Sequence, residues 1–305
     1  MSSPQSGIFA LGAASHVYLE VDRRTGTTAS KLAGAVGMAR ELETTMEGVN
    51  VVAGFRPQLW RELMPGDAPV DVAGFEADLI GPDGFVMPAT QHDAVLWLSG
   101  GAHDTVFDVA RRTLGAIGAI ASVVDETWGW PYQHDRDLTG FIDGTENPTV
   151  LDAPEVACIP EGGPGAGGSV LLLQKWRHDA TAWESLAVDR QEKAMGRTKL
   201  DGVELEDRRP ESHVGRTDQE VFGKIFRRNM PYGSVSDHGT MFVGFSADQR
   251  RLASMLKSMT GLTDGVRDAL TPFVRPLTGA YYFVPSTESL RRCVDTAAPT
   301  KGPQG

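Results

Sequence analysis

The segment H-V-Y-L-E-V at residues 16–21 is a short apolar strand that leads into an amphipathic stretch at residues 29–46. In that stretch Leu32, Val36, Met38, Leu42 and Met46 recur at roughly helical spacing, which predicts a helix with one apolar face. The same order recurs downstream, with strands expected at residues 93–98, 169–175 and 240–245 and helices at residues 105–120, 182–194 and 247–259. The fold is therefore built on a repeated strand–helix unit.

A glycine-rich stretch, P-E-G-G-P-G-A-G-G at residues 160–168, divides the repeats into two halves and predicts a loop. Further short strands are expected at residues 51–55 and 280–284. Two such repeats per half predict an α+β protein of two ferredoxin-like domains, each an antiparallel sheet with helices on one face. We place these domains at residues 5–155 and 156–290, followed by a tail at residues 291–305. A doubly wound α/β fold is the alternative, but no G-x-G-x-x-G follows the first strand.

Composition limits the class of protein. The 305 residues are 41% hydrophobic and 23% charged, as in a soluble globular protein. A net charge of −11 argues against nucleic acid or an anionic membrane surface as a partner. Cys158 and Cys293 are too few for a disulfide framework or a cysteine-held metal cluster. The first basic residue is Arg23, and no segment approaches the length of a membrane span. We expect a cytoplasmic protein.

The segment T-G-F-I-D-G-T-E-N-P-T at residues 139–149 places a single acid, Asp143, on a turn. Gly140 and Gly144 permit tight backbone geometry, and Phe141 and Ile142 favour burial. An acid held this way and partly desolvated suits proton transfer. The structural alternative is an aspartate that supports an ordinary turn.

Histidine spacing gives little support for a zinc site but leaves a single-ligand site open. The chain has His16, His92, His103, His134, His178, His213 and His238, with no i, i+4 pair and no Cys-x-x-Cys. His213 lies in D-R-R-P-E-S-H-V-G-R-T-D at residues 207–218, where we expect a loop. One imidazole there is enough to ligate haem iron, although spacing does not select it from the seven.

The segment K-I-F-R-R-N-M-P-Y-G at residues 224–233 predicts a strand over residues 225–229. Its alternation puts Ile225, Arg227 and Asn229 on one face and Phe226 and Arg228 on the other. The first face suits a pocket that stabilises developing negative charge. The alternative is that Arg227 pairs with a surface acid.

Several aromatic residues flank these motifs: Trp128, Trp130, Tyr132, Trp176 and Trp183. Such residues usually pack in a core. Close to a strong oxidant they would also be candidates to relay electrons to the surface.

Together, T-G-F-I-D-G-T-E-N-P, E-S-H-V-G-R-T-D and R-R-N-M-P-Y-G, with M-G-R-T-K at residues 195–199, resemble the dye-decolorizing peroxidase family, most closely its bacterial members with short insertions. The resemblance implies paired ferredoxin-like domains of the dimeric α+β barrel type and one haem b per subunit. It makes His213 the proximal iron ligand and places Asp143, Arg227 and Asn229 on the distal side. The remaining cofactor contacts that it implies are Gly144, Thr145, Glu146, Ile225 and Arg197, the last reaching a propionate.

The activity that the resemblance implies is reduction of hydrogen peroxide and oxidation of small organic donors such as dyes and phenols through an iron–oxo haem. It also implies a homo-oligomer, a dimer or larger. Residues 291–305 contain no clear docking peptide for an encapsulin shell. The run from His213 to Arg227 is short for the family, so we expect one side of the pocket to differ. The alternatives are a porphyrin-processing protein, acting by oxidative decarboxylation or iron release, and a non-enzymatic ferredoxin-like binding module.

Overall fold

The computed structural model describes residues 2–44, 48–133 and 136–297. The strands are β1 (Ser15–Arg23), β2 (Asn50–Phe55), β3 (Leu79–Ile80), β4 (Val86–Met87), β5 (Ala94–Gly100), β6 (Ala121–Gly129), β7 (Ser169–His178), β8 (Phe226–Arg227), β9 (Met230–Gly233), β10 (His238–Ser246), β11 (Val274–Pro276) and β12 (Ala280–Val284). The helices are η1 (Ser6–Ile8), α1 (Ala29–Thr44), α2 (Pro57–Leu63), α3 (His103–Ile117), α4 (Ala153–Ala157), α5 (Ala180–Glu184), α6 (Val188–Met195), α7 (His213–Arg216), α8 (Gln219–Phe222), α9 (Gln249–Met259) and α10 (Thr287–Ala297).

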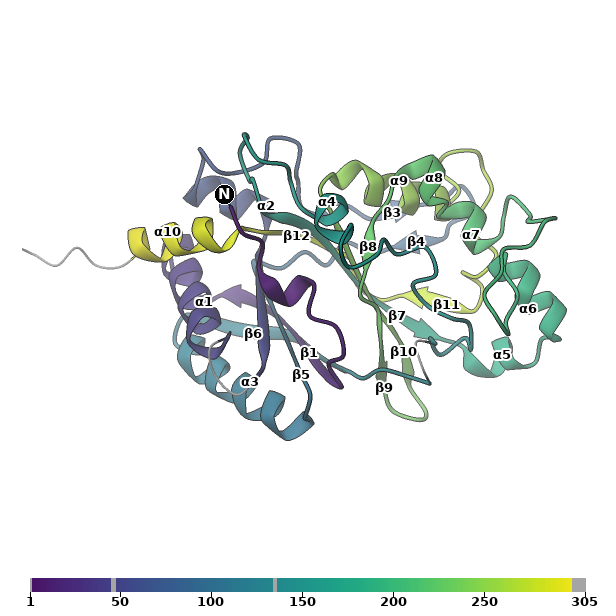
Figure 1. Cartoon of the computed structure of the whole chain (residues 1–305), viewed down its shortest axis with the longest axis horizontal. Coiled ribbons are helices and arrows are strands. Elements are labelled where there is room, and N and C mark those ends of the chain that lie inside the picture. Colours follow the sequence, from purple (N-terminus) through teal and green to yellow (C-terminus); the bar gives the residue numbers. More distant parts are fainter. Residues whose placement is uncertain (1, 45–47, 134–135, 298–305) are drawn as a thin grey trace, which may run out of the picture.

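The main sheet closes on itself. Strands pair in the order β7-β12-β2-β5-β1-β6-β9-β10, and β10 pairs again with β7, while β11 and β8 attach to β7 and β10 (Figure 1). Across the described residues every pairing in this sheet is antiparallel. The doubly wound alternative, which needs parallel strands, is therefore wrong. The fold is mixed α/β, with a barrel-like sheet.

Strand alternation divides the apolar residues between the inside and the outside of this barrel-like sheet. On β1, Val17 and Leu19 belong to a core beneath the helices, whereas Tyr18 belongs to a separate core inside the ring. On β7, Leu171 points inward and Leu172 outward. Because both faces of these strands are buried, their sequences are nearly continuous runs of apolar residues.

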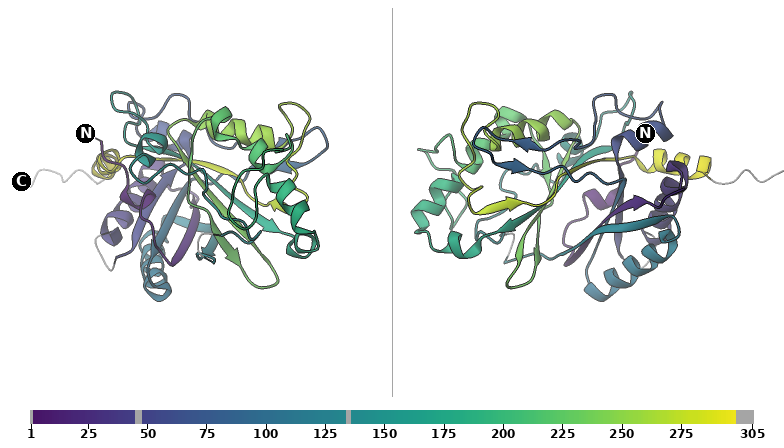
Figure 2. Two further views of the ribbon diagram at one scale, coloured as in Figure 1. Left: turned by 45° about the vertical axis from the view of Figure 1, so that its right-hand side comes forward. Right: turned by 180° about the vertical axis from the view of Figure 1, so that it is seen from behind.

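Helices cover the sheet on two sides. In Figures 1 and 2, α1, α3 and α10 lie at one end of the molecule, and α5 to α9 lie at the other. Leu290 and Cys293 of α10 share a core with Leu32 of α1, so α10 carries the first residues of the segment 291–305 onto the N-terminal half. The two halves also share one sheet, because Phe283 pairs with Phe55 and Gly129 pairs with Tyr232.

Three local expectations need correction. The helix expected at residues 182–194 is two helices, α5 and α6, because Asp179 caps the first and Ala187 adopts an extended conformation before the second. The expected loop around His213 contains the short helix α7, which begins at that residue. The strand expected at residues 225–229 is only the two residues of β8, although the backbone N–H of Arg228 still donates to Val243 O at 2.8 Å.

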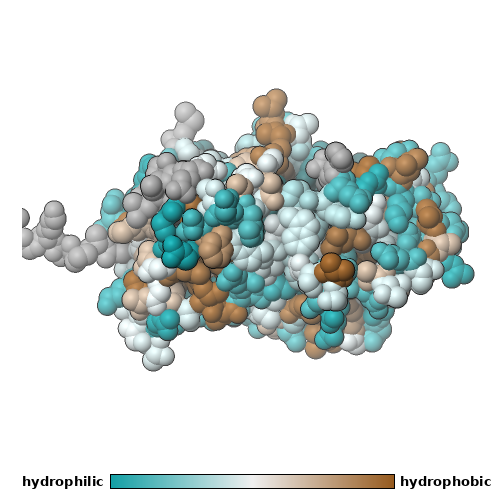
Figure 3. All heavy atoms as spheres, turned by 90° about the horizontal axis from the view of Figure 1, so that it is seen from below, coloured by the Kyte–Doolittle hydropathy of each residue, from teal (hydrophilic) through white to brown (hydrophobic). Residues whose placement is uncertain are grey.

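On the face seen from below in Figure 3, apolar side chains are scattered among polar ones. Among the helices described, none has the length and apolar character that crossing a membrane requires.

The barrel closure gives a stability prediction. A Cβ added at Gly239 of β10 would lie 1.8 Å from the backbone oxygen of Trp176 on β7, so Gly239→Ala must push the two strands apart. We expect a loss of about 3 kcal/mol in the free energy of unfolding, measured by urea denaturation of the apoprotein. Gly101→Ala is the control, since no atom lies within 4 Å of its added Cβ. Equal stability of the two variants would contradict this account of the closure.

Candidate functional site

A cavity with an empty volume of about 1230 Å³, including its open mouth, lies between the outer face of β7 and β10 and the helices α7 and α9. Leu172 and Phe242 line it from the sheet, and Met255 and Met259 line it from α9. Its largely apolar wall suits an organic ligand.

Asp143 enters the cavity from the turn at residues 139–149. The turn depends on left-handed backbone at Gly140 (φ 84°) and Gly144 (φ 74°), which an L side chain would strain. The Asp143 carboxylate accepts hydrogen bonds from the backbone N–H of Gly144 at 2.7 Å and from Asn229 Nδ2 at 3.3 Å. The acid therefore faces a cavity and is held by a second motif.

The alternation predicted around β8 is confirmed: Ile225, Arg227 and Asn229 line the cavity. Arg228 points to the other side, where its guanidinium lies 5.2 Å from the Trp97 ring centroid. Within the described residues, Arg227 Nε is buried without a hydrogen-bond partner.

Asn147 ties the two motifs together. Its Nδ2 donates to Arg227 O and its Oδ1 accepts from Arg227 N, each at 2.9 Å. Asn229 Oδ1 in turn accepts from Val243 N at 3.0 Å. The acid, the guanidinium and the amide thus project from a backbone that is fixed at several points.

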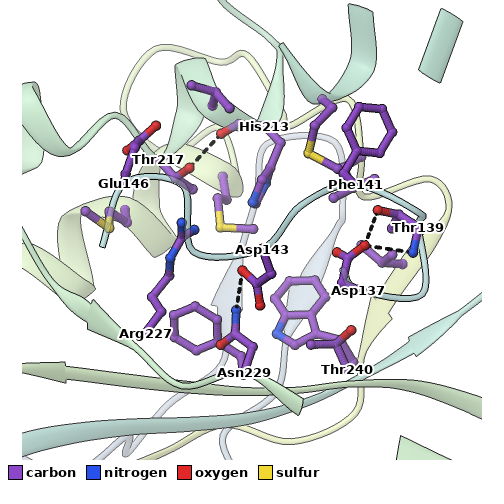
Figure 4. Close-up of a pocket in the computed structure, with 18 of the residues that line it drawn as sticks. Asp137, Thr139, Phe141, Asp143, Glu146, His213, Thr217, Arg227, Asn229 and Thr240 are labelled. Atoms are coloured by element: carbon purple, nitrogen blue, oxygen red, sulfur yellow. Dashed lines mark hydrogen bonds between the residues drawn. The ribbon is translucent and has the colours of Figure 1, made fainter. Parts of the chain in front are cut away.

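His213 lies across the cavity from these three residues, with its ring directed toward Asp143 (Figure 4). Ser212 caps α7 with its hydroxyl and so fixes the helix that begins at His213. His213 Nδ1 lies 2.7 Å from Asp268 Oδ2, and the Asp268 side chain is fully buried. Because Nδ1 is engaged, Nε2 is the nitrogen available to a ligand.

Two effects oppose each other at His213. Burial alone would lower its pKa, but attraction to the Asp268 carboxylate and the hydrogen bond between them raise the pKa overall. The described residues hold no group of three or more His, Cys, Asp or Glu side chains able to bind a metal ion. With Nδ1 engaged by Asp268, His213 offers one protein nitrogen to a ligand in the cavity.

At another edge of the cavity Arg197 forms an ion pair with Glu146 and donates to Gly202 O at 2.9 Å. Thr145, Glu146 and Arg197 all line the cavity. Among the catalytic and cofactor-binding residues predicted from the sequence, Gly144 alone does not line the described cavity. Its backbone N–H donates to Asp143.

Sequence reasoning missed a polar group at the opposite edge, consisting of Asp137, Thr139, Gln174, His178 and Thr240. His178 Nε2 lies 3.1 Å from Thr240 Oγ1, and burial lowers the pKa of His178 to about 4, so its ring is neutral. Burial and then the neighbouring Asp143 raise the pKa of Asp137 to about 6. These positions had no signal, because their side chains meet only through the fold.

Asp137 gives a pH prediction. Its pKa is higher in the folded protein than the ordinary value of 3.8, so between about pH 4 and 6 the folded state retains a proton that the unfolded state releases. Its contribution to stability therefore falls as pH rises through that window. The Asp137 side chain is only half-buried, so we expect a change of about 1–2 kcal/mol rather than the full value for such a shift. Chemical denaturation of apoprotein Asp137→Asn at several pH values should give a shallower slope, and an unchanged slope would refute the assignment.

The other residues singled out from the sequence are dispersed. Trp176 lines the cavity, and Trp183 supports its wall by donating to Thr139 O at 2.9 Å. Trp128, Trp130 and Tyr132 lie outside the cavity lining. Of the remaining histidines, His16 contacts Trp97, His92 contacts Asp22, His103 contacts Ser15 and His238 contacts Ser234 O, while His134 is outside the described residues.

Comparisons with known proteins agree with this geometry. The domain profile described as "Dyp-type peroxidase, C-terminal" matches residues 134–289. The dye-decolorizing peroxidase of Brevibacterium linens is 34% identical over 289 residues, which cover 90% of this chain and 78% of that protein.

Solved structures give the same result. The dye-decolorizing protein from V. cholerae superposes with a TM-score of 0.85 at 35% identity, covering 94% of this chain and 99% of that one. A variant of DypB from Rhodococcus jostii RHA1, described as a complex with heme, superposes with a TM-score of 0.84 at 31% identity, covering 94% and 98%. With its motifs gathered in one cavity and relatives matched over nearly its whole length, the chain belongs to the dye-decolorizing peroxidase family.

Proposed function

We propose that the protein is a haem peroxidase that reduces hydrogen peroxide and oxidises small organic one-electron donors such as dyes and phenols. One observation carries the proposal: His213, hydrogen-bonded to the buried Asp268, faces Asp143, Arg227 and Asn229 across an apolar cavity. A metal ligand on one side and a proton acceptor with a cation on the other are what peroxide cleavage requires.

The residues present fit haem b, one per subunit. The apolar wall suits the porphyrin faces, and His213 Nε2 would bind the iron. Thr145, Glu146 and Ile225 would lie along the porphyrin, next to Gly144, and Arg197 would reach a propionate by leaving Glu146. Haem, when bound, supplies the electrons that reduce peroxide and regains them from organic donors.

The chain's own groups manage protons and charge. Asp143 would take a proton from the inner oxygen of peroxide and return it to the outer oxygen, which leaves as water. A guanidinium is a poor proton acceptor, so Arg227 would not serve as that base; it would stabilise charge on the departing oxygen. Asn229, anchored to β10 and to Asp143, orients the carboxylate.

An absorption spectrum tests the proposal directly. Purified protein supplied with haem should show a Soret band that shifts when one equivalent of peroxide is added and returns when a phenol or dye follows. A protein that forms no Soret band would refute the proposal and favour a binding module. Loss of carboxyl groups from the bound porphyrin, found by mass spectrometry, would favour porphyrin processing. Family membership does not favour either alternative.

Asp268 is expected to set haem affinity through His213. Asp268→Asn keeps the size of the side chain but removes the charge that orients and polarises the imidazole, so haem affinity should fall by about 10–100-fold. Transfer of haem to a scavenging apoprotein measures this change. Asp264→Asn is the control, because Asp264 pairs with Arg216 rather than His213. Equal rates of haem loss in both variants would contradict the role.

Architecture and assembly complete the proposal. We infer two ferredoxin-like units of the dimeric α+β barrel type, at residues 5–155 and 156–290, supported by the two helical layers on one shared sheet. A homo-oligomer, a cytoplasmic location and the lack of an encapsulin docking peptide at residues 291–305 stay predictions. The free thiols Cys158 and Cys293 are in keeping with a reducing compartment.

A further inference from the structure

The interior of the barrel holds a phenol–carboxylate pair that the peroxide chemistry above does not use. Tyr282 of β12 donates its hydroxyl hydrogen to Glu20 Oε1 of β1 at 2.6 Å. These strands are not neighbours in the sheet, so the two side chains meet across the barrel interior. Both are buried almost completely, and the contact is shielded from water.

This pair lies one layer of backbone behind the cavity. Tyr282 pairs across the sheet with Leu171 of β7, whose side chain shares the interior core. The next residue, Leu172, faces outward and lines the cavity. Because successive side chains of a strand point to opposite faces, a single strand separates the surroundings of Tyr282 from the cavity.

Two other buried tyrosines of the described chain lack this arrangement. The hydroxyl groups of Tyr18 and Tyr232 are buried without a hydrogen-bond partner. Oxidising a phenol makes its proton strongly acidic, so a buried phenol with no acceptor resists losing an electron. Tyr282 has an acceptor in place at general-base distance.

We propose that Tyr282 is a redox-active tyrosine, which gives an electron to the oxidised cofactor in the cavity and its phenolic proton to Glu20. The inference rests on the proposed function, since haem that has reacted with peroxide is the oxidant. One electron leaves Tyr282 and reduces that haem by one equivalent. The Tyr282 O–H bond breaks, an O–H bond forms at Glu20, and a neutral tyrosyl radical stays beside a neutral carboxylic acid.

The surroundings favour this transfer. Burial opposes charge on Glu20, so accepting a proton relieves an unfavourable state. Burial raises the pKa of Glu20 to about 7, against the hydrogen bond from Tyr282 and attraction to His92 and Lys175, with Asp125 adding to the rise. Asp22 is a further charge acting on Tyr282.

Lys175 Nζ lies 2.6 Å from both oxygens of Asp125, which is partly exposed. Both groups of this ion pair act electrostatically on Glu20. The radical would store one oxidising equivalent in the barrel when no donor occupies the cavity.

The test uses the haem-loaded protein, one equivalent of hydrogen peroxide and no added donor, frozen within the first turnover and examined by electron paramagnetic resonance. Wild type should give a tyrosyl signal that narrows when the protein is made with ring-deuterated tyrosine. Tyr282→Phe should lower the signal by about tenfold or more, and Glu20→Gln should do the same although the phenol remains. Tyr18→Phe is the matched control, with the same substitution in the same interior, and should keep the wild-type signal.

The pH dependence adds a second readout. Glu20 must be ionised to accept the proton, so the wild-type signal should rise as pH increases through about 7. In Glu20→Gln that rise should be absent. If Tyr282 and Glu20 had only a structural role, the radical signal would show the same pH dependence in wild type and in Glu20→Gln.

The experiment distinguishes failure of the proposed peroxidase function from failure of the inference about Tyr282. A Soret band that does not respond to peroxide would refute the proposed function itself. A normal response with an equal radical signal in Tyr282→Phe and wild type would overturn the inference and leave the function intact. Should Tyr282→Phe not fold, Glu20→Gln decides alone, and a wild-type signal at every pH in that variant would overturn the inference.

Discussion

Replacing His213 by alanine should lower haem affinity by more than about 100-fold and remove the normal Soret band, because the variant loses the nitrogen that we propose binds the iron, and not only a supporting contact. The apoprotein should also lose about 3 kcal/mol of stability. His213 is a hydrogen-bonding partner of Asp268, whose buried carboxylate would keep only its bond from the backbone N–H of Leu270. Haem titration followed by absorption measures the first effect, and urea denaturation of the apoprotein measures the second.

His178→Ala is the matched control for this experiment. His178 also lines the cavity, but it contacts Thr240 and is neutral because burial lowers its pKa to about 4. It should keep haem and its Soret band. Free imidazole should partly restore haem binding to His213→Ala by occupying the vacated space. If His213→Ala binds haem with an unchanged Soret band, another residue is the axial ligand.

The distal residues were readable from the sequence because their placement depends on local rules. Alternation along five residues was enough to bring Ile225, Arg227 and Asn229 to one face, even though the strand itself is only β8. The glycine turn likewise predicted a fixed acid, and both glycines have positive φ.

Hydrogen-bonded side chains that are far apart in the chain could not be paired from the sequence. Asp268 is 55 residues from His213, and Tyr282 is 262 residues from Glu20. Nothing in the sequence near either carboxylate marks its partner. The first pair meets where α7 packs against the segment that follows α9, and the second meets because the sheet closes. The prediction of one continuous helix over residues 182–194 was wrong for a related reason. The spacing of apolar residues does not reveal that Trp183 is buried and that its indole N–H donates to Thr139 O.

Replacing Arg227 by leucine should slow the reaction with peroxide more than replacing Asp143 by alanine does near neutral pH. Arg227→Leu removes the cation that stabilises the departing oxygen, and we expect a loss of about 100–1000-fold in the rate. Arg197, the other arginine lining the described cavity, would be engaged by a haem propionate in the loaded protein and so cannot substitute. For Asp143→Ala we expect about tenfold, because Asp137 lines the same cavity and interacts with Asp143 electrostatically. Its carboxyl group provides a second proton acceptor.

Stopped-flow absorption of the haem-loaded variants measures both rates in the same experiment. Arg227→Lys should recover part of the rate, since it restores a positive charge without the planar guanidinium. Asp143→Ala combined with Asp137→Asn should lose far more than the product of the two single effects, because the two carboxylates act in place of each other. A slower reaction in Asp143→Ala than in Arg227→Leu would reverse the assignment. Proton transfer rather than charge stabilisation would then limit peroxide cleavage.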